Sequence, residues 1–140
     1  MEITEQIIEK KFNEYNKEYF NNELPKPKFG LLKTYRTCGY FSCKKIIGKR
    51  KLKGQRIDIS VYYDWDENEL KNVIIHEMIH YYLAHKHIDN ELTHGEAFTN
   101  MANDFNEKYN LKISEKVDCS NFKKTKNAPK ISWFLTQMFY

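Results

Sequence analysis

The sequence predicts a single domain of the α+β class. Apolar residues recur at helical spacing over 3–20, 64–85 and 96–109, whereas residues 29–63 are rich in β-branched and aromatic types. A chain of 140 residues can bury a core of useful size without division into several domains. The 15% content of aromatic residues argues against disorder over most of the chain.

The first helix and the strands follow from local signals. The helix at 3–20 is expected to end there because an Asn-Asn pair and two prolines follow it. The next segment predicts three strands, at 29–35, 39–46 and 56–63, which we expect to pair in a small antiparallel sheet. The alternating residues of 131–140 predict a docked strand, so the sheet would contain three to four strands.

The helix at 64–85 is apolar around most of its circumference, which is typical of a helix in the centre of a domain. Asp64 or Asp66 is its expected N-cap. A further helix with a single apolar face completes the core. We therefore expect a core domain over residues 1–112 and a tail over 113–140 that carries the docked strand.

Composition and charge exclude several classes of protein. The start of the chain lacks the basic and apolar regions of a signal peptide, and no apolar run is long enough to span a membrane. Three cysteines, Cys38, Cys43 and Cys119, form neither a disulfide framework nor a CxxC pair. These features predict a cytoplasmic protein without membrane contact. A net charge of +4 is too small to indicate nucleic-acid binding by itself.

The most informative motif is HEMIH at residues 76–80. Positions four apart lie on one face of a helix, so His76 and His80 could hold one ion between them. Glu77 is turned by about 100° from His76, which suits a base rather than a ligand. Zinc in a catalytic site takes three protein ligands and leaves one position open. The candidates for the third ligand are His85, His87, Glu91, His94 and Glu96.

We favour His94 as the third ligand, with Glu96 as the second choice. His94 precedes Gly95 and the start of a helix, and the intervening residues allow the chain to turn back toward His80. The alternative is that His76 and His80 are core histidines bonded to backbone or carboxylate groups. Burying two histidines and an acid on an apolar helix without an ion or a hydrogen-bond network would be costly, which favours the metal.

Several motifs, taken in order, resemble those of the SprT-like metallopeptidases, the relatives of Spartan. They are YFNNELPKPKFGL, TCGYF, IDIS, ELKNVIIHEMIHYYL and THGEAF, and they extend from about residue 12 to residue 109. The resemblance implies a zincin-like fold, zinc bound by His76, His80 and His94, and Glu77 as the catalytic base. It also implies a protease, and because the better-known members cleave proteins attached to DNA, it implies a role in DNA repair.

Two departures from the family pattern matter. Only Cys119 lies downstream of the helical core, so the cysteine-rich zinc ribbon of many relatives cannot form in the usual way. Glu96 follows the HG pair where relatives usually have proline, and either residue suits a helix start.

The implied mechanism assigns Glu77 the proton transfers. It would take a proton from water activated by zinc and pass it to the leaving amine. The strand at 56–63 is expected to bind an extended peptide or protein substrate at an exposed edge. The candidates for the donor to the oxyanion are Tyr40, Tyr62, Tyr63 and Tyr81.

The strongest charge run lies at 44–56, where seven residues are basic and none is acidic. It could track a phosphate backbone, with aromatic residues nearby for stacking on single-stranded DNA. The alternative is a solvated hairpin tip, where lysines also discourage edge aggregation. Two further functions stay open at this point: a metal-stabilised binding module that does not cleave, and a nucleic-acid adaptor that works through residues 44–56.

Overall fold

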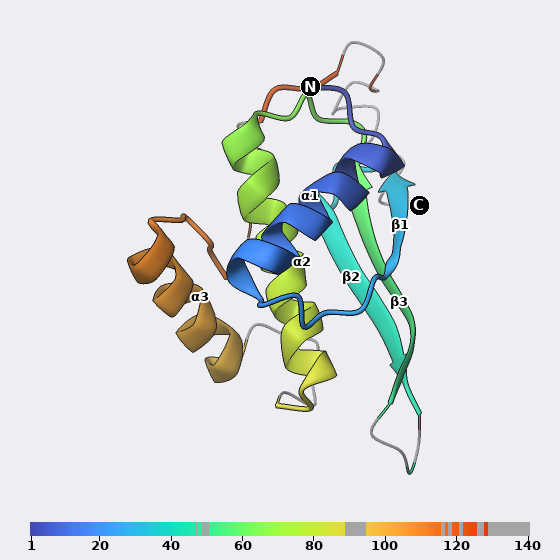
Figure 1. Cartoon of the computed structure of the whole chain (residues 1–140). Helices are drawn as coiled ribbons and strands as arrows, with labels where there is room; N and C mark the ends of the chain where they lie inside the picture. Colours follow the sequence, from blue (N-terminus) through green and yellow to red (C-terminus); the bar gives the residue numbers. More distant parts are fainter. Residues whose placement is uncertain are drawn as a thin grey trace.

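The computed structural model describes residues 1–46, 48, 51–88, 95–115, 117, 119–120, 122–125 and 128 of the chain. Within these residues it contains three helices and three strands (Figure 1). In chain order they are α1 (Glu5–Tyr19), β1 (Lys28–Leu32), β2 (Gly39–Lys45), β3 (Leu52–Ser60), α2 (Glu67–His85) and α3 (Glu96–Tyr109). The α+β class is therefore confirmed, whereas the strand predicted at 131–140 lies outside the described residues.

The sheet is mixed, and the prediction of an antiparallel sheet was wrong. β3 occupies the centre, paired with β1 in parallel and with β2 in antiparallel orientation. The loop from β1 to β2 passes around the end of β3: Val61 N–H donates to Leu32 O at 2.8 Å, and Ser60 N–H donates to Cys38 O at 2.9 Å. β1 and β2 therefore run in opposite directions on either side of β3, and β1 must be parallel to it. The alternation of residue types shows which side chains share a face, but it does not identify the neighbouring strand.

The central position of β3 overturns a second expectation. Residues 56–63 were expected to offer an exposed edge, but β3 is paired on both sides over much of its length. In the part of the chain that is described, β2 has β3 as its strand partner on one side and lies at the edge of the sheet. A bulge between Ser42 and Lys44 interrupts its pairing. The strand that packs against α2 and keeps an edge is therefore β2.

The helix ends are set by caps that the sequence contains. Thr4 Oγ1 accepts a hydrogen bond from the Ile7 amide at 3.2 Å at the start of α1. Asp66, one of the two predicted N-caps, accepts from two backbone amides in the first turn of α2. The Glu69 carboxylate accepts from the Asp66 amide in return, which completes a capping box. α3 covers the range predicted for it.

α2 is the central element of the core. It packs on the sheet and between α1 and α3 (Figure 1). Its apolar side chains are buried around most of the helix, as predicted. His76, Glu77 and His80 are buried among them, and they form the candidate site described below. None of the described helices has the length and apolarity that a membrane span requires.

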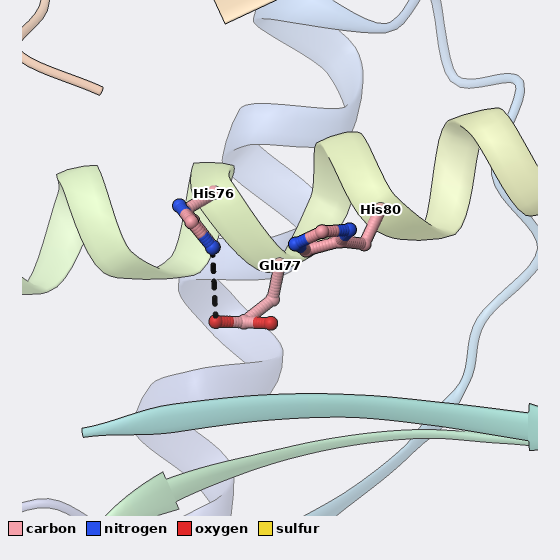
Figure 2. A group of neighbouring side chains, drawn as sticks. All are labelled: His76, Glu77 and His80. Atoms are coloured by element: carbon pink, nitrogen blue, oxygen red, sulfur yellow. Dashed lines mark ion pairs between the residues drawn. The ribbon is translucent and has the colours of Figure 1, made fainter. Parts of the chain in front are cut away.

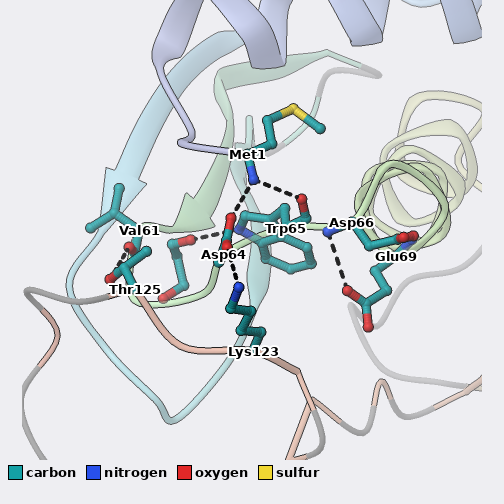
Figure 3. Close-up of polar contacts among 9 residues, drawn as sticks. Met1, Val61, Asp64, Trp65, Asp66, Glu69, Lys123 and Thr125 are labelled. Carbon is teal, nitrogen blue, oxygen red and sulfur yellow. Dashed lines mark hydrogen bonds and ion pairs between the residues drawn. The ribbon is translucent and has the colours of Figure 1, made fainter.

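The described part of the predicted tail returns to the core near the start of α2 (Figure 3). The Asp64 amide donates to Lys123 O at 2.6 Å, and the Thr125 amide donates to Tyr62 O at 3.0 Å. The Asp64 carboxylate accepts from the Met1 amine and lies 3.5 Å from Lys123 Nζ. These contacts hold residue 1 and residues 123–125 against the loop before α2. The division of the chain at residues 112 and 113 stays a prediction.

Candidate metal centre

Three ionisable side chains gather on one buried face of α2. His76, Glu77 and His80 are 4%, 6% and 9% exposed, and their ligand atoms lie within 4.8 Å of one another. The two imidazole rings come from consecutive turns of the helix, and their centres are 5.0 Å apart. Figure 2 shows Glu77 extending from α2 toward the sheet, with its Oε2 atom 3.9 Å from His76 Nε2. The residues of the HEMIH motif therefore form one cluster that could hold a metal ion.

The environment of Glu77 favours the neutral carboxyl group when no cation is nearby. Burial raises the pKa of Glu77 from its ordinary value of 4.5 to about 8, although a hydrogen bond from the Phe41 backbone amide opposes this shift. A positive charge beside the carboxylate would lower the pKa again, because opposite charges stabilise the ionised form. A carboxyl group with a pKa near neutrality is suited to accept and release protons.

Gly39 allows β2 to approach this carboxyl group. A Cβ atom at residue 39 would lie 3.3 Å from Glu77 Oε2 and only 2.8 Å from Val73 Cγ1. Real Cβ atoms essentially never show the second distance, so a side chain here would force Val73 or β2 to shift. The glycine of the TCGYF motif is therefore needed for the close contact between β2 and the HEMIH helix.

Phe98, in the first turn of α3, packs against both imidazole rings. Its ring centre lies 4.7 Å from that of His76 and 4.5 Å from that of His80, and it stacks on the His80 ring at an angle of 24°. Phe98 is fully buried. The apolar contact restricts the rotation of both rings. It also shows that the start of α3 lies next to the candidate metal centre.

His94, the predicted third ligand, lies outside the described residues. Gly95 is the N-cap of α3, and Glu96, the second choice, is an exposed residue at its start. In the part of the chain that can be described, the group of candidate ligand residues does not include Glu96, His85 or His87. The assignment of His94 therefore stays a prediction, although the position of Phe98 four residues later places this end of α3 beside His76 and His80.

The orientation of His76 depends on a residue that the sequence did not reveal. His76 Nδ1 lies 2.9 Å from the backbone oxygen of Ser114. A carbonyl can only accept a hydrogen bond, so Nδ1 must carry the proton. This tautomer leaves Nε2, the atom on the side of Glu77, with a lone pair for a metal. A backbone carbonyl has no side-chain signature, so no sequence signal could have identified Ser114.

The cluster opens into a cleft of about 340 Å³. The cleft is lined by His76, Glu77 and His80, by the loop before β2 and the first residues of β2, and by Val117 and Cys119. Of the four tyrosines considered as oxyanion donors, Tyr40 is the one that lines this cleft among the described residues, and it is 55% exposed. Tyr81, by contrast, is buried and donates its hydroxyl hydrogen to Pro25 O at 2.8 Å.

Cys38 and Cys119 also line the cleft, and the Cys38 thiol is a poor metal ligand in this state. A hydrogen bond with Cys119 and burial both raise the pKa of the Cys38 thiol. Cys119 Sγ in turn lies 3.4 Å from the Tyr63 hydroxyl oxygen. Metal ions bind the thiolate, so a thiol held neutral in this way competes weakly with imidazole.

A comparison with family models shows to which family the chain belongs. The model of the SprT-like family matches residues 8–118. The chain belongs to the SprT-like family. The matched range contains the whole HEMIH motif, the HG pair and Ser114, and it extends beyond the motifs recognised in the sequence. No significant match was found among curated proteins or among solved structures.

The donor set of this SprT-like protein suits a zinc ion. Neutral imidazole is a preferred zinc ligand, and the hydrogen bond to Ser114 O places the proton of neutral His76 on Nδ1, so that Nε2 carries the lone pair. His76 and His80 are neighbours on one helix face, and both border the cleft. His76 and His80 would supply two of the three protein ligands that a catalytic zinc ion takes.

Proposed function

We propose that this SprT-like protein is a zinc-dependent endopeptidase with a zincin-like arrangement, in which His76, His80 and His94 bind zinc and Glu77 is the catalytic base. The observation that carries this proposal is the position of Glu77. It is a buried carboxyl group beside an imidazole pair, and it borders an open cleft. A purely structural role would not explain this arrangement, because a buried acid without a charged partner destabilises a fold.

The mechanism follows from the groups that surround the cleft. A bound zinc ion would act as a Lewis acid that activates a water molecule and polarises the peptide carbonyl. Glu77 accepts the proton released by the attacking water and delivers it to the leaving amine. The hydrogen bond to Ser114 O and the contact with Phe98 hold His76 in position during this process.

We propose that a peptide substrate binds along β2. An extended peptide can add to an exposed sheet edge through backbone hydrogen bonds. The first residues of β2 line the cleft next to Glu77, and Tyr40 lies there with its side chain exposed. A peptide paired with this edge would pass directly in front of the candidate metal centre.

A protease assay with an unfolded protein as substrate tests the function. Cleavage by the zinc-loaded protein should disappear when a chelator removes the metal and return when zinc is added back. If the protein binds zinc but does not cleave the substrate, the proposal is wrong. The alternative of a metal-stabilised binding module then replaces it.

We also propose that the β2–β3 hairpin brings the protease to DNA-bound proteins by contacting single-stranded DNA. The hairpin extends beyond the body of the protein (Figure 1). All four of its described lysines are exposed, namely Lys44, Lys45, Lys51 and Lys53. Exposed lysines at the outer ends of these two strands can approach phosphates without a change in the core.

Charge reversal tests this contact. The double variant K51E/K53E should bind a single-stranded oligonucleotide at least about 10-fold more weakly than the wild type at low salt, because it loses two potential phosphate contacts. The matched control is K10E/K17E on the exposed side of α1, which loses the same net charge away from the hairpin. Fluorescence anisotropy at two salt concentrations measures both variants. Equal weakening in both variants, or no wild-type binding at low salt, contradicts the proposed contact.

A further inference from the structure

The segment that follows α3 runs along α2 next to the candidate metal centre. The Lys112 amide donates to Asn72 Oδ1 at 3.3 Å, and Ser114 O accepts from His76 Nδ1 at 2.9 Å. The two contacts are four residues apart on α2 and two residues apart on the following segment. Four residues of helix rise about 6 Å, and two residues of extended chain span about 6.6 Å, so the two spacings match.

Ile113, which lies between these two contacts, is hydrogen-bonded to α3. Ile113 is buried, and both of its backbone polar groups bond to the Asn106 side chain on α3. Asn106 Nδ2 donates to Ile113 O at 2.7 Å, and the Ile113 amide donates to Asn106 Oδ1 at 2.7 Å. Because both bonds are short and made by one planar amide, they fix the position and the direction of the peptide that precedes Ser114.

We propose that Asn106 is a positioning residue for His76. It acts through Ile113 and the Ser114 carbonyl, which selects the tautomer of His76 and fixes the plane of its ring. No atom of Asn106 needs to contact the metal or the substrate for this role. The inference deepens the proposed function and rests on its metal site, but the orientation of His76 is also a property of the metal-free chain and can be measured there.

The protein provides a matched control for this residue. Asn16, on α1, holds Leu24 by the same pair of bonds: its Nδ2 donates to Leu24 O at 2.9 Å, and its Oδ1 accepts from the Leu24 amide at 3.2 Å. Asn16 is 7% exposed, so its loss should also destabilise the fold. The segment it holds does not contact His76 in any described hydrogen bond. A general loss of stability and a specific effect on His76 can therefore be separated.

The first experiment measures the His76 tautomer by ¹⁵N NMR of the imidazole in the full-length, metal-free protein at pH 8. In the wild type and in Asn16→Ala, His76 should be the form protonated at Nδ1. In Asn106→Ala, the Ser114 carbonyl is no longer held in place, and both tautomers should be populated. An unchanged His76 signal in folded Asn106→Ala would overturn the proposal.

The second experiment measures zinc affinity by competition with a chromophoric chelator. Asn106→Ala should bind zinc more weakly, with an upper limit of about 10- to 100-fold, the usual effect of losing the outer hydrogen-bond partner itself, because the variant loosens the Ser114 carbonyl without removing it. Asn16→Ala should stay within about 2-fold of the wild type, well below that effect. Equal affinities for Asn106→Ala and the wild type would overturn the positioning role.

A conservative variant covers the case in which Asn106→Ala does not fold. Asn106→Asp keeps the acceptor for the Ile113 amide and loses the donor to Ile113 O. It should therefore populate both His76 tautomers and bind zinc more weakly than the wild type. Wild-type behaviour of Asn106→Asp in both measurements would contradict the proposal. A wild type that binds no zinc but shows the predicted NMR result would disprove the metal site and leave the positioning of His76 intact.

Discussion

Glu77→Gln is expected to retain bound zinc and to lose peptidase activity by about 10²- to 10⁴-fold, the range that a general base contributes. Glutamine has the shape of the neutral carboxyl group and cannot accept a proton. The proposed metal ligands are imidazoles, so the substitution leaves them in place. Metal analysis of the purified variant, combined with its initial rate of cleavage, measures both parts. Cleavage at the wild-type rate would show that another group is the base.

The stability of the same variant without metal provides the control for its fold. The pKa of Glu77 is raised in the folded chain to about 8 from an ordinary value of 4.5. The unfolded chain therefore releases this proton first, and the free energy of unfolding of the wild type should fall as the pH rises through this window. The decrease is at most about 1.4 kcal/mol per pH unit.

Glu77→Gln should lack this decrease, so the variant should match the wild type near pH 4 and exceed it at pH 8. Urea denaturation of both metal-free proteins across this pH range measures the difference. Both proteins contain the same two histidines, so the difference reports on Glu77 together with its coupling to His76. A constant difference at every pH would show that the Glu77 carboxyl group is not desolvated.

His94→Ala is expected to weaken zinc binding by at least about 100-fold, more than the loss of an outer hydrogen-bond partner usually costs. Phe98 contacts both imidazoles from the first turn of α3, and His94 lies four residues before it. Zinc titration by chelator competition measures the effect. The matched variant Glu96→Ala, which removes an exposed acid at the start of the same helix, should bind zinc with nearly wild-type affinity.

The opposite result would reassign the third ligand. If Glu96→Ala loses zinc and His94→Ala keeps it, the centre has two imidazoles and one carboxylate. Such a set also occurs in catalytic zinc sites. If neither variant changes the affinity, the third ligand is a different residue.

The helices were predictable because their signals are local. The Asp66 capping box, the apolar circumference of α2 and the spacing of His76 and His80 all lie within a few turns of one helix. Periodicity and capping depend on neighbouring residues in the sequence, and a single chain contains that information.

The order of the strands and the partner of His76 depend on contacts between distant segments. The parallel pairing of β1 with β3 depends on how the loop to β2 passes around the end of β3. The bond from His76 to Ser114 spans 38 positions and ends on a backbone oxygen. Neither contact leaves a periodic pattern or a distinctive residue type, so a single sequence does not reveal it.

The segment from Lys112 to Ser114 has a practical consequence for the design of shortened proteins. A fragment that stops at Lys112 would keep every described helix and strand and the whole HEMIH motif. It would nevertheless lack the oxygen that orients His76. Such a fragment could give a normal circular dichroism spectrum and still bind zinc weakly. A trimmed version of this protein should therefore extend past residue 114.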